Sequence, residues 1–160
     1  MKKVLKSKVK IRFQDCDPFN HLNNSRYIDY FINAREEQLL ENYNLNVFED
    51  MLTTGNTWVV TSNQIQYLSP VNTGDTVIIE SQLNQFSDTN LLVEMRMWNE
   101  EETTLKSVIW VRFTHFNIKT KKTGKHASKF MELFDSIVSP IETKFFEERC
   151  INLLKQLKNA

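Results

Sequence analysis

The sequence predicts one α+β domain, residues 1–160, that combines a long helix with an antiparallel sheet. Apolar residues recur every three or four positions in only two long segments, and the other patterned segments alternate with a period of two. The links between the later alternating segments are short, as they are between antiparallel neighbours. A length of 160 residues is also about that of a single domain.

The first strand and the helix are separated by a polar loop. Alternating apolar and basic residues predict a strand over 8–14. The next residues, DCDPFNHLNN, are typical of a loop that ends in a helix cap. We expect a helix over about 23–43, with Asn23 or Asn24 as its N-cap.

Four further strands are expected, as a meander in which each strand pairs with the next along the chain. They cover residues 57–68, 76–85, 91–98 and 104–118. A lysine-rich turn follows. A second helix is expected over about 140–158, because Ser139, Pro140 and Glu142 form a capping box.

Composition excludes several classes of protein. Twenty basic and twenty acidic residues give a formal net charge of zero, which argues against nucleic acid or an anionic membrane as the partner. No apolar run approaches the length of a membrane helix, and the N-terminal lysines are not followed by a signal sequence, so we expect a cytoplasmic protein. Cys16 and Cys150 are expected to be reduced, and no cysteine or histidine spacing predicts a metal site.

The loop before the helix is the best candidate for chemistry. A capped helix presents unpaired backbone N–H groups near Asn23 and Asn24, and Asp15 and Asp17 lie just upstream. A carboxylate facing such donors has what acyl transfer requires. The alternative is that Asp17 and the loop asparagines only shape the turn.

The three histidines have different expected roles. His21, in the loop, either positions substrate, acts as an acid or base, or packs under the loop. His115 alternates with apolar residues and is expected in the core, whereas His126 is expected in a surface turn. The nearby lysines bind the phosphates of a carried nucleotide or simply face solvent; they are Lys119, Lys121, Lys122, Lys125 and Lys129.

Two segments resemble the hydroxybenzoyl-CoA thioesterase-like family of hot-dog proteins. They are FQDCDPFNHLNNSRYIDYFINAREE and QYLSPVNTGDTVIIES. The resemblance implies a hot-dog fold, in which a curved antiparallel five-stranded sheet wraps around the long helix. Here a second helix would follow at the C-terminus. It also implies a homodimer or homotetramer with acyl tunnels at the subunit interface.

The resemblance further implies hydrolysis of acyl-CoA thioesters. The family's catalytic carboxylate falls on Asp17, as nucleophile or general base, and its oxyanion donor falls on the backbone N–H of Asn24. His21, Asn23 and Tyr27 would contact substrate. Asn20 replaces a common family Gly, and some branches have His where Asn24 stands.

No cofactor is expected apart from coenzyme A as part of the substrate, and acyl carrier protein is an alternative carrier. Two other functions remain open. One is an enoyl-thioester hydratase or dehydratase that uses an Asp and a His. The other is a non-catalytic module that binds acyl thioesters or assembles with partners.

Overall fold

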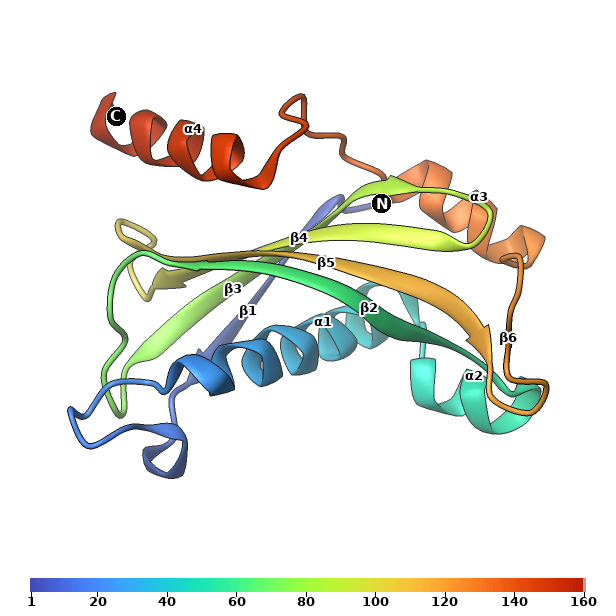
Figure 1. The fold of residues 1–160 in the computed structure, drawn as a ribbon, viewed down its shortest axis with the longest axis horizontal. Helices are drawn as coiled ribbons and strands as arrows, with labels where there is room; N and C mark the ends of the chain where they lie inside the picture. Colours follow the sequence, from blue (N-terminus) through green and yellow to red (C-terminus); the bar gives the residue numbers. More distant parts are fainter. Residues whose placement is uncertain (160) are drawn as a thin grey trace.

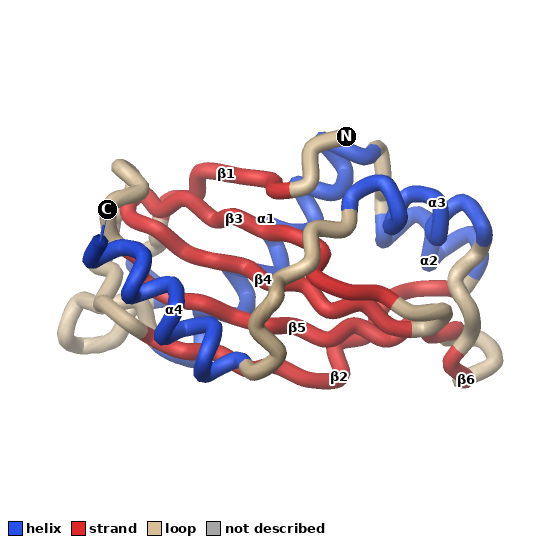
Figure 2. Tube along the Cα trace, turned by 90° about the horizontal axis from the view of Figure 1, so that it is seen from above, coloured by secondary structure: helices blue, strands red, loops and turns tan. Residues whose placement is uncertain are grey.

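The computed structural model describes residues 1–159 and confirms the hot-dog fold (Figure 1). A curved antiparallel sheet wraps around helix α1 (Tyr27–Tyr43), which lies along its concave face. Helix α4 (Phe146–Asn159) lies on the opposite, convex face (Figures 1 and 2). The strand order across the sheet is β1 (Val4–Lys10), β3 (Thr76–Phe86), β4 (Asn90–Asn99), β5 (Leu105–Asn117) and β2 (Asn56–Tyr67), with the short β6 (Lys122–Thr123) beside β5.

The predicted meander is wrong in one respect, because β2 pairs with β5 and not with β3. Only β3, β4 and β5 are consecutive neighbours. The link over residues 68–75 therefore runs from one side of the sheet to the other at the end where α1 begins (Figure 1). This crossing brings the link against the loop that precedes α1.

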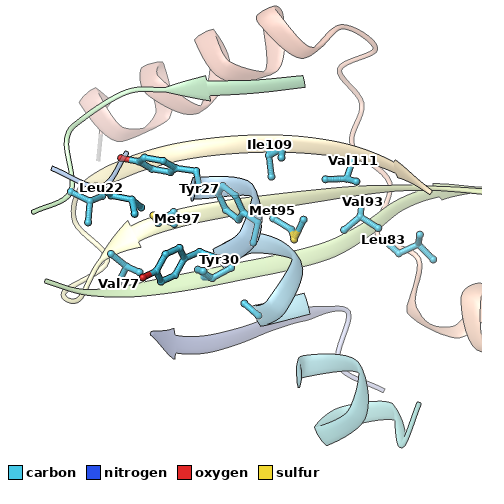
Figure 3. Close-up of a cluster of buried hydrophobic side chains, with 14 of the residues drawn as sticks. Leu22, Tyr27, Tyr30, Val77, Leu83, Val93, Met95, Met97, Ile109 and Val111 are labelled. Carbon is cyan, nitrogen blue, oxygen red and sulfur yellow. The ribbon is translucent and has the colours of Figure 1, made fainter. Parts of the chain in front are cut away.

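The core lies between α1 and the sheet, and Figure 3 shows part of it. Tyr27, Tyr30 and Phe31 on α1 are buried against the strands, where Met95 and Met97 are also buried. The apolar area removed from water by such contacts is the main stabilising contribution to a fold of this kind.

The bounds predicted for the first strand, 8–14, are wrong. Strand β1 covers Val4–Lys10, and residues 13–15 form a short 3-10 turn.

Two helices were not predicted. Helix α2 (Val47–Thr54) is capped by the Asn46 side chain, which accepts from the Glu49 N–H at 3.1 Å, and it ends at Gly55. Helix α3 (Ser128–Ile137) buries Phe130, Phe134 and Ile137 against the core. Both helices are short, so tertiary packing contributes more to them than helix propensity does.

The C-terminal helix is confirmed, but its predicted start at residue 140 is wrong. Helix α4 covers Phe146–Asn159. The preceding segment is bonded to β3 instead: the Ser139 N–H donates to the Leu83 carbonyl at 2.8 Å, and Gln82 Nε2 donates to the Ser139 carbonyl at 3.0 Å. The capping-box residues are thus held by tertiary contacts and do not begin a helix.

Helix α4 is joined to the sheet by a buried ion-pair cluster centred on Glu94. Arg149 of α4 donates to both oxygens of this carboxylate at 2.9 Å, and Arg96 also donates to it at 2.9 Å. Trp110 Nε1 donates at 2.8 Å. Cys150 packs alongside, and burial raises the pKa of its thiol to about 11.

Among residues 1–159, no helix combines the length and the apolar character that crossing a membrane requires.

The expectation that His126 lies in a surface turn is wrong. Its ring is buried with Trp58, His115 and Phe134 at the end of the sheet farthest from the start of α1. Its Nδ1–H donates to the Ser87 carbonyl at 3.0 Å, and its Nε2 accepts from Trp58 Nε1 at 3.0 Å. The neutral ring is therefore fully hydrogen-bonded, and a protonated ring would turn Nε2 into a second donor facing the indole N–H.

We predict that His126 makes stability depend on pH. Burial lowers its pKa below the ordinary 6.5 and His115 adds to this effect, whereas the hydrogen bond to the Ser87 carbonyl and the charge of Asp88 oppose it. The unfolded chain then binds the proton more readily, so the stability present above about pH 6.5 is lost as the pH falls toward the lowered pKa. Urea unfolding from pH 7 to 5 should show this decrease, and His126→Gln should flatten it. Equal slopes in the two proteins would contradict the assignment.

Candidate active site

The loop before α1 is held in place by the link between β2 and β3. The Leu22 N–H donates to the Val71 carbonyl at 2.7 Å, and the Thr73 N–H donates to the Asn20 carbonyl at 3.0 Å. Asn20 has a left-handed backbone with φ of 66°. Asn adopts this conformation more readily than other non-glycine residues, so it can occupy a position where Gly is common.

Asp17 both shapes the loop and leaves part of its carboxylate available. Its Oδ1 accepts from the N–H groups of Phe19 at 2.9 Å and His21 at 3.1 Å. No hydrogen bond from another described residue reaches Oδ2. The capping role and a chemical role are therefore compatible, because they use different oxygens.

The start of the helix presents an unpaired donor. The Asn23 side chain accepts from the Ser25 N–H at 3.0 Å and caps a 3-10 turn over Asn24–Arg26. The Asn24 carbonyl accepts from the Tyr67 hydroxyl at 2.9 Å. Within residues 1–159 the Asn24 N–H has no hydrogen-bond acceptor, so it is free to bind a developing negative charge at the positive end of the helix.

One open cleft brings most of the predicted site residues together. Asp17, His21, Asn24 and Tyr27 all line it, whereas Asn23 does not, because its side chain is used as the cap. The His21 ring makes no hydrogen bond to another described side chain. The cleft is completed by Leu22, Tyr67, Leu68, Ser69 and Pro70.

The sequence patterns did not predict one wall of the cleft, which is formed by the end of β2 and the link that follows it. The Tyr67 ring meets the Tyr27 ring edge-on, with centroids 5.0 Å apart. Burial raises the pKa of Tyr27 to about 12, so its hydroxyl stays protonated at neutral pH. The motif QYLSP was recognisable in the sequence, but nothing local indicated that it would face a loop more than forty residues earlier.

The second loop carboxylate is used for structure. Asp15 Oδ2 accepts from the Tyr30 hydroxyl at 2.7 Å, and that hydroxyl accepts from the Arg12 N–H at 3.0 Å. Asp15 thus ties the loop to α1 and does not line the cleft.

The lysine-rich turn, next to β6, lies at the end of the sheet opposite to the start of α1 (Figure 1), and none of its lysines lines the cleft. Two of its charges are already paired, Lys125 with Asp88 at 2.8 Å and Lys129 with Asp50 at 3.4 Å. No cluster of three or more potential metal-ligating side chains occurs in the described part of the chain.

The cleft combines an acidic oxygen with a backbone donor in one small space. A carboxylate positioned there can attack a carbonyl carbon or deprotonate a water molecule. A donor at a helix N-terminus stabilises negative charge on the carbonyl oxygen during that attack. The geometry is therefore suited to acyl transfer or hydrolysis.

Comparisons with known proteins identify the family. A family model of the thioesterase-like superfamily matches residues 11–141. The long-chain acyl-CoA thioesterase FadM of Escherichia coli (strain K12) is 25% identical over 134 residues, which cover 84% of this chain and 99% of FadM.

Solved structures share the fold. A DHNA-CoA thioesterase from Staphylococcus aureus has a TM-score of 0.77 at 14% identity, over 84% of this chain and 90% of that one. A hypothetical protein from the same organism, solved in complex with CoA, has a TM-score of 0.76 at 16% identity, over 89% and 90% of the two chains.

Proposed function

The chain belongs to the thioesterase-like superfamily, and we propose that it hydrolyses acyl-CoA thioesters with Asp17 and the Asn24 N–H as its catalytic groups. The observation that carries this assignment is the cleft, which is lined by both residues. The thioesterase name of the relative FadM supports the reaction, and the CoA complex of a structural neighbour supports the carrier. We propose coenzyme A, and not acyl carrier protein, as the carrier.

The reaction adds water across the thioester. Asp17 either attacks the carbonyl carbon, forming an anhydride that water then cleaves, or removes a proton from the attacking water. In both routes the Asn24 N–H donates to the carbonyl oxygen as it becomes negative. In the first route the carbon–sulfur bond breaks as the anhydride forms, and the thiolate takes a proton from solvent; in the second it breaks after water has added, and the thiolate takes the proton that Asp17 removed.

Residues around these two groups have supporting roles in the proposal. Tyr67 fixes the Asn24 carbonyl and so orients the peptide unit that follows it. Tyr27 forms part of the wall of the cleft, and His21 lies at its edge as a contact for substrate. Asn23 acts through its cap, which sets the start of the helical segment.

A cytoplasmic location is part of the proposal. Two free cysteines are consistent with a reducing compartment such as the cytoplasm.

We also propose that the protein is a homodimer joined through β2. This strand is at the edge of the sheet, is twelve residues long, contains no charged residue and is exposed over 60–64. The other edge strand, β1, carries Lys6, Lys8 and Lys10, and lysines discourage strand pairing between molecules. A long uncharged edge is suited to antiparallel pairing with a second copy.

Asp17→Asn should abolish most of the activity and preserve the fold. The Asn oxygen can still accept from Phe19 and His21, but it has no charge with which to attack or deprotonate water. We expect kcat for thiol release from decanoyl-CoA to fall about a hundredfold or more. Asp135→Asn, an exposed change of the same kind, is the control. Normal turnover by Asp17→Asn would remove Asp17 from the mechanism.

Asn24→Pro tests the backbone donor directly, because it deletes only the N–H and the side chain. Proline is tolerated at a first helical position, and the Asn23 ψ of 133° is compatible with a following proline. We expect a loss of about a hundredfold or more in kcat. Asn24→Ala retains the N–H and should retain activity. If both variants lose activity equally, the side chain and not the N–H is responsible.

The double variant Ser62→Lys, Gln64→Lys should separate the dimer, because like charges would face each other across paired β2 strands. Light scattering should give the mass of two chains for the native protein and of one chain for the variant. Gln85→Lys, on β3, should leave the native mass unchanged. A monomeric native protein, or a variant that remains dimeric, would refute β2 pairing.

A further inference from the structure

A second, mostly apolar cavity lies under the C-terminal half of α1. It has a volume of about 70 Å³ and opens beside α2. Its lining comes from the three helices α1, α2 and α3, from the segment between α1 and α2, and from four strands. The apolar lining residues are Ile32, Leu39, Leu45, Val47, Trp58, Leu83, Leu91, Val93, Phe113, Leu133, Phe134 and Ile137.

The only charged residues that line this cavity are Arg35 and Glu36, and they differ in exposure. Glu36 is exposed to solvent, whereas Arg35 is only 6% exposed. No carboxylate of residues 1–159 lies within ion-pair distance of the Arg35 guanidinium. A buried cation without a counterion is unfavourable, because burial removes its hydration.

The neighbours of Arg35 are neutral. One of its terminal nitrogens donates to the Ser81 hydroxyl at 2.9 Å, and that hydroxyl donates to Gln38. Gln38 in turn donates to the Ile79 carbonyl at 2.9 Å and to the Ser7 hydroxyl at 2.7 Å. This network orients the guanidinium but supplies no negative charge.

Arg35 nevertheless remains a cation at neutral pH. Burial lowers the pKa of its guanidinium to about 10, which is still well above 7. A guanidinium has five N–H donors in a planar fork, and only one hydrogen bond from Arg35 to another described residue is present. Unused donors therefore remain for a ligand that enters the cavity.

We propose that this cavity binds the carboxylate end of an aliphatic chain, with Arg35 as its counterion. A carboxylate matches the guanidinium in charge and in its paired acceptors, and the other lining residues match a hydrocarbon chain. A single water needs about 10–15 Å³ by a comparable measure, so the cavity holds the carboxylate and a few methylene groups.

Two ligands have this chemistry. One is the free acid that thioester hydrolysis releases, and the other is an acyl thioester with a second carboxylate at its far end. The origin of the ligand rests on the proposed function, whereas the binding site itself does not. Arg35 lies about 12 Å along α1 from Tyr27, which lines the catalytic cleft, so this site is separate from that cleft.

Calorimetric titration with octanoate and 1-octanol tests the site without any turnover. The native protein should bind octanoate more tightly than octanol. Arg35→Met should weaken octanoate binding about tenfold or more and leave octanol binding unchanged. Arg112→Met, which removes an exposed arginine, should bind both ligands as the native protein does.

Thermal unfolding gives an independent measurement. If Arg35 were only a structural tie, Arg35→Met would lower Tm. The proposal predicts that Tm without ligand is equal or higher, because an unpaired buried charge is gone, and that octanoate no longer raises it. Leu133→Trp, which fills the cavity and retains Arg35, should abolish octanoate binding and covers the case in which Arg35→Met does not fold.

Three results would overturn the proposal. They are equal affinity of the native protein for octanoate and octanol, unchanged octanoate binding by Arg35→Met, and unchanged octanoate binding by a folded Leu133→Trp. These results are distinct from a failure of the thioesterase assignment, since no thioester is present in the titration.

The two sources of ligand are distinguished by turnover. If the second carboxylate of an acyl chain is the ligand, Arg35→Met lowers kcat/KM for decanoyl-CoA that bears a terminal carboxylate and not for decanoyl-CoA itself. If the released acid is the ligand, both kcat/KM values are retained and only octanoate binding is lost. Either result supports the site.

Discussion

The contact between α1 and the concave face of the sheet is the constraint on which the rest of the structure depends. Phe31 is completely buried at its centre, and Tyr27 and Tyr30 extend the contact toward the start of the helix. Because this contact fixes the helix axis, it also fixes where the 3-10 turn that precedes α1, with the unpaired Asn24 N–H, lies. The position of the candidate cleft is therefore a consequence of how the helix is packed.

The same contact includes polar residues that a purely apolar core would not need. Gln38 and Arg35 face the sheet from α1 and are bonded to Ser81 of β3. The two ends of one helix thus present different groups: the turn that leads into it has an unpaired backbone donor in the same cleft as Asp17, and its C-terminal half holds a buried cation beside an apolar cavity. On the convex face of the sheet, Glu94 and Arg149 attach α4. Strand β2 is the long edge strand of the sheet.

Local sequence patterns located most of the elements and the site loop. The last four predicted strands agree closely in their bounds with the alternating pattern, whereas the first lies four residues earlier than predicted. Asn23 is a cap, as its position suggested, but it caps the 3-10 turn over Asn24–Arg26, and α1 itself begins at Tyr27. Errors arose where a distant partner decided the outcome. Ser139 is held by β3, and His126 is buried by Trp58. Neither partner is near in sequence, so no local pattern indicated the contact.

The sequence by itself determined the fold class, the superfamily and the loop that carries Asp17 and Asn24, because periodicity, capping and short motifs are properties of neighbouring residues. Only the tertiary structure decided that β2 lies beside β5, that Tyr67 forms a wall of the cleft and that Arg35 is buried without a counterion. These features depend on which surfaces exclude water together, and that is settled only when segments distant in the chain come into contact.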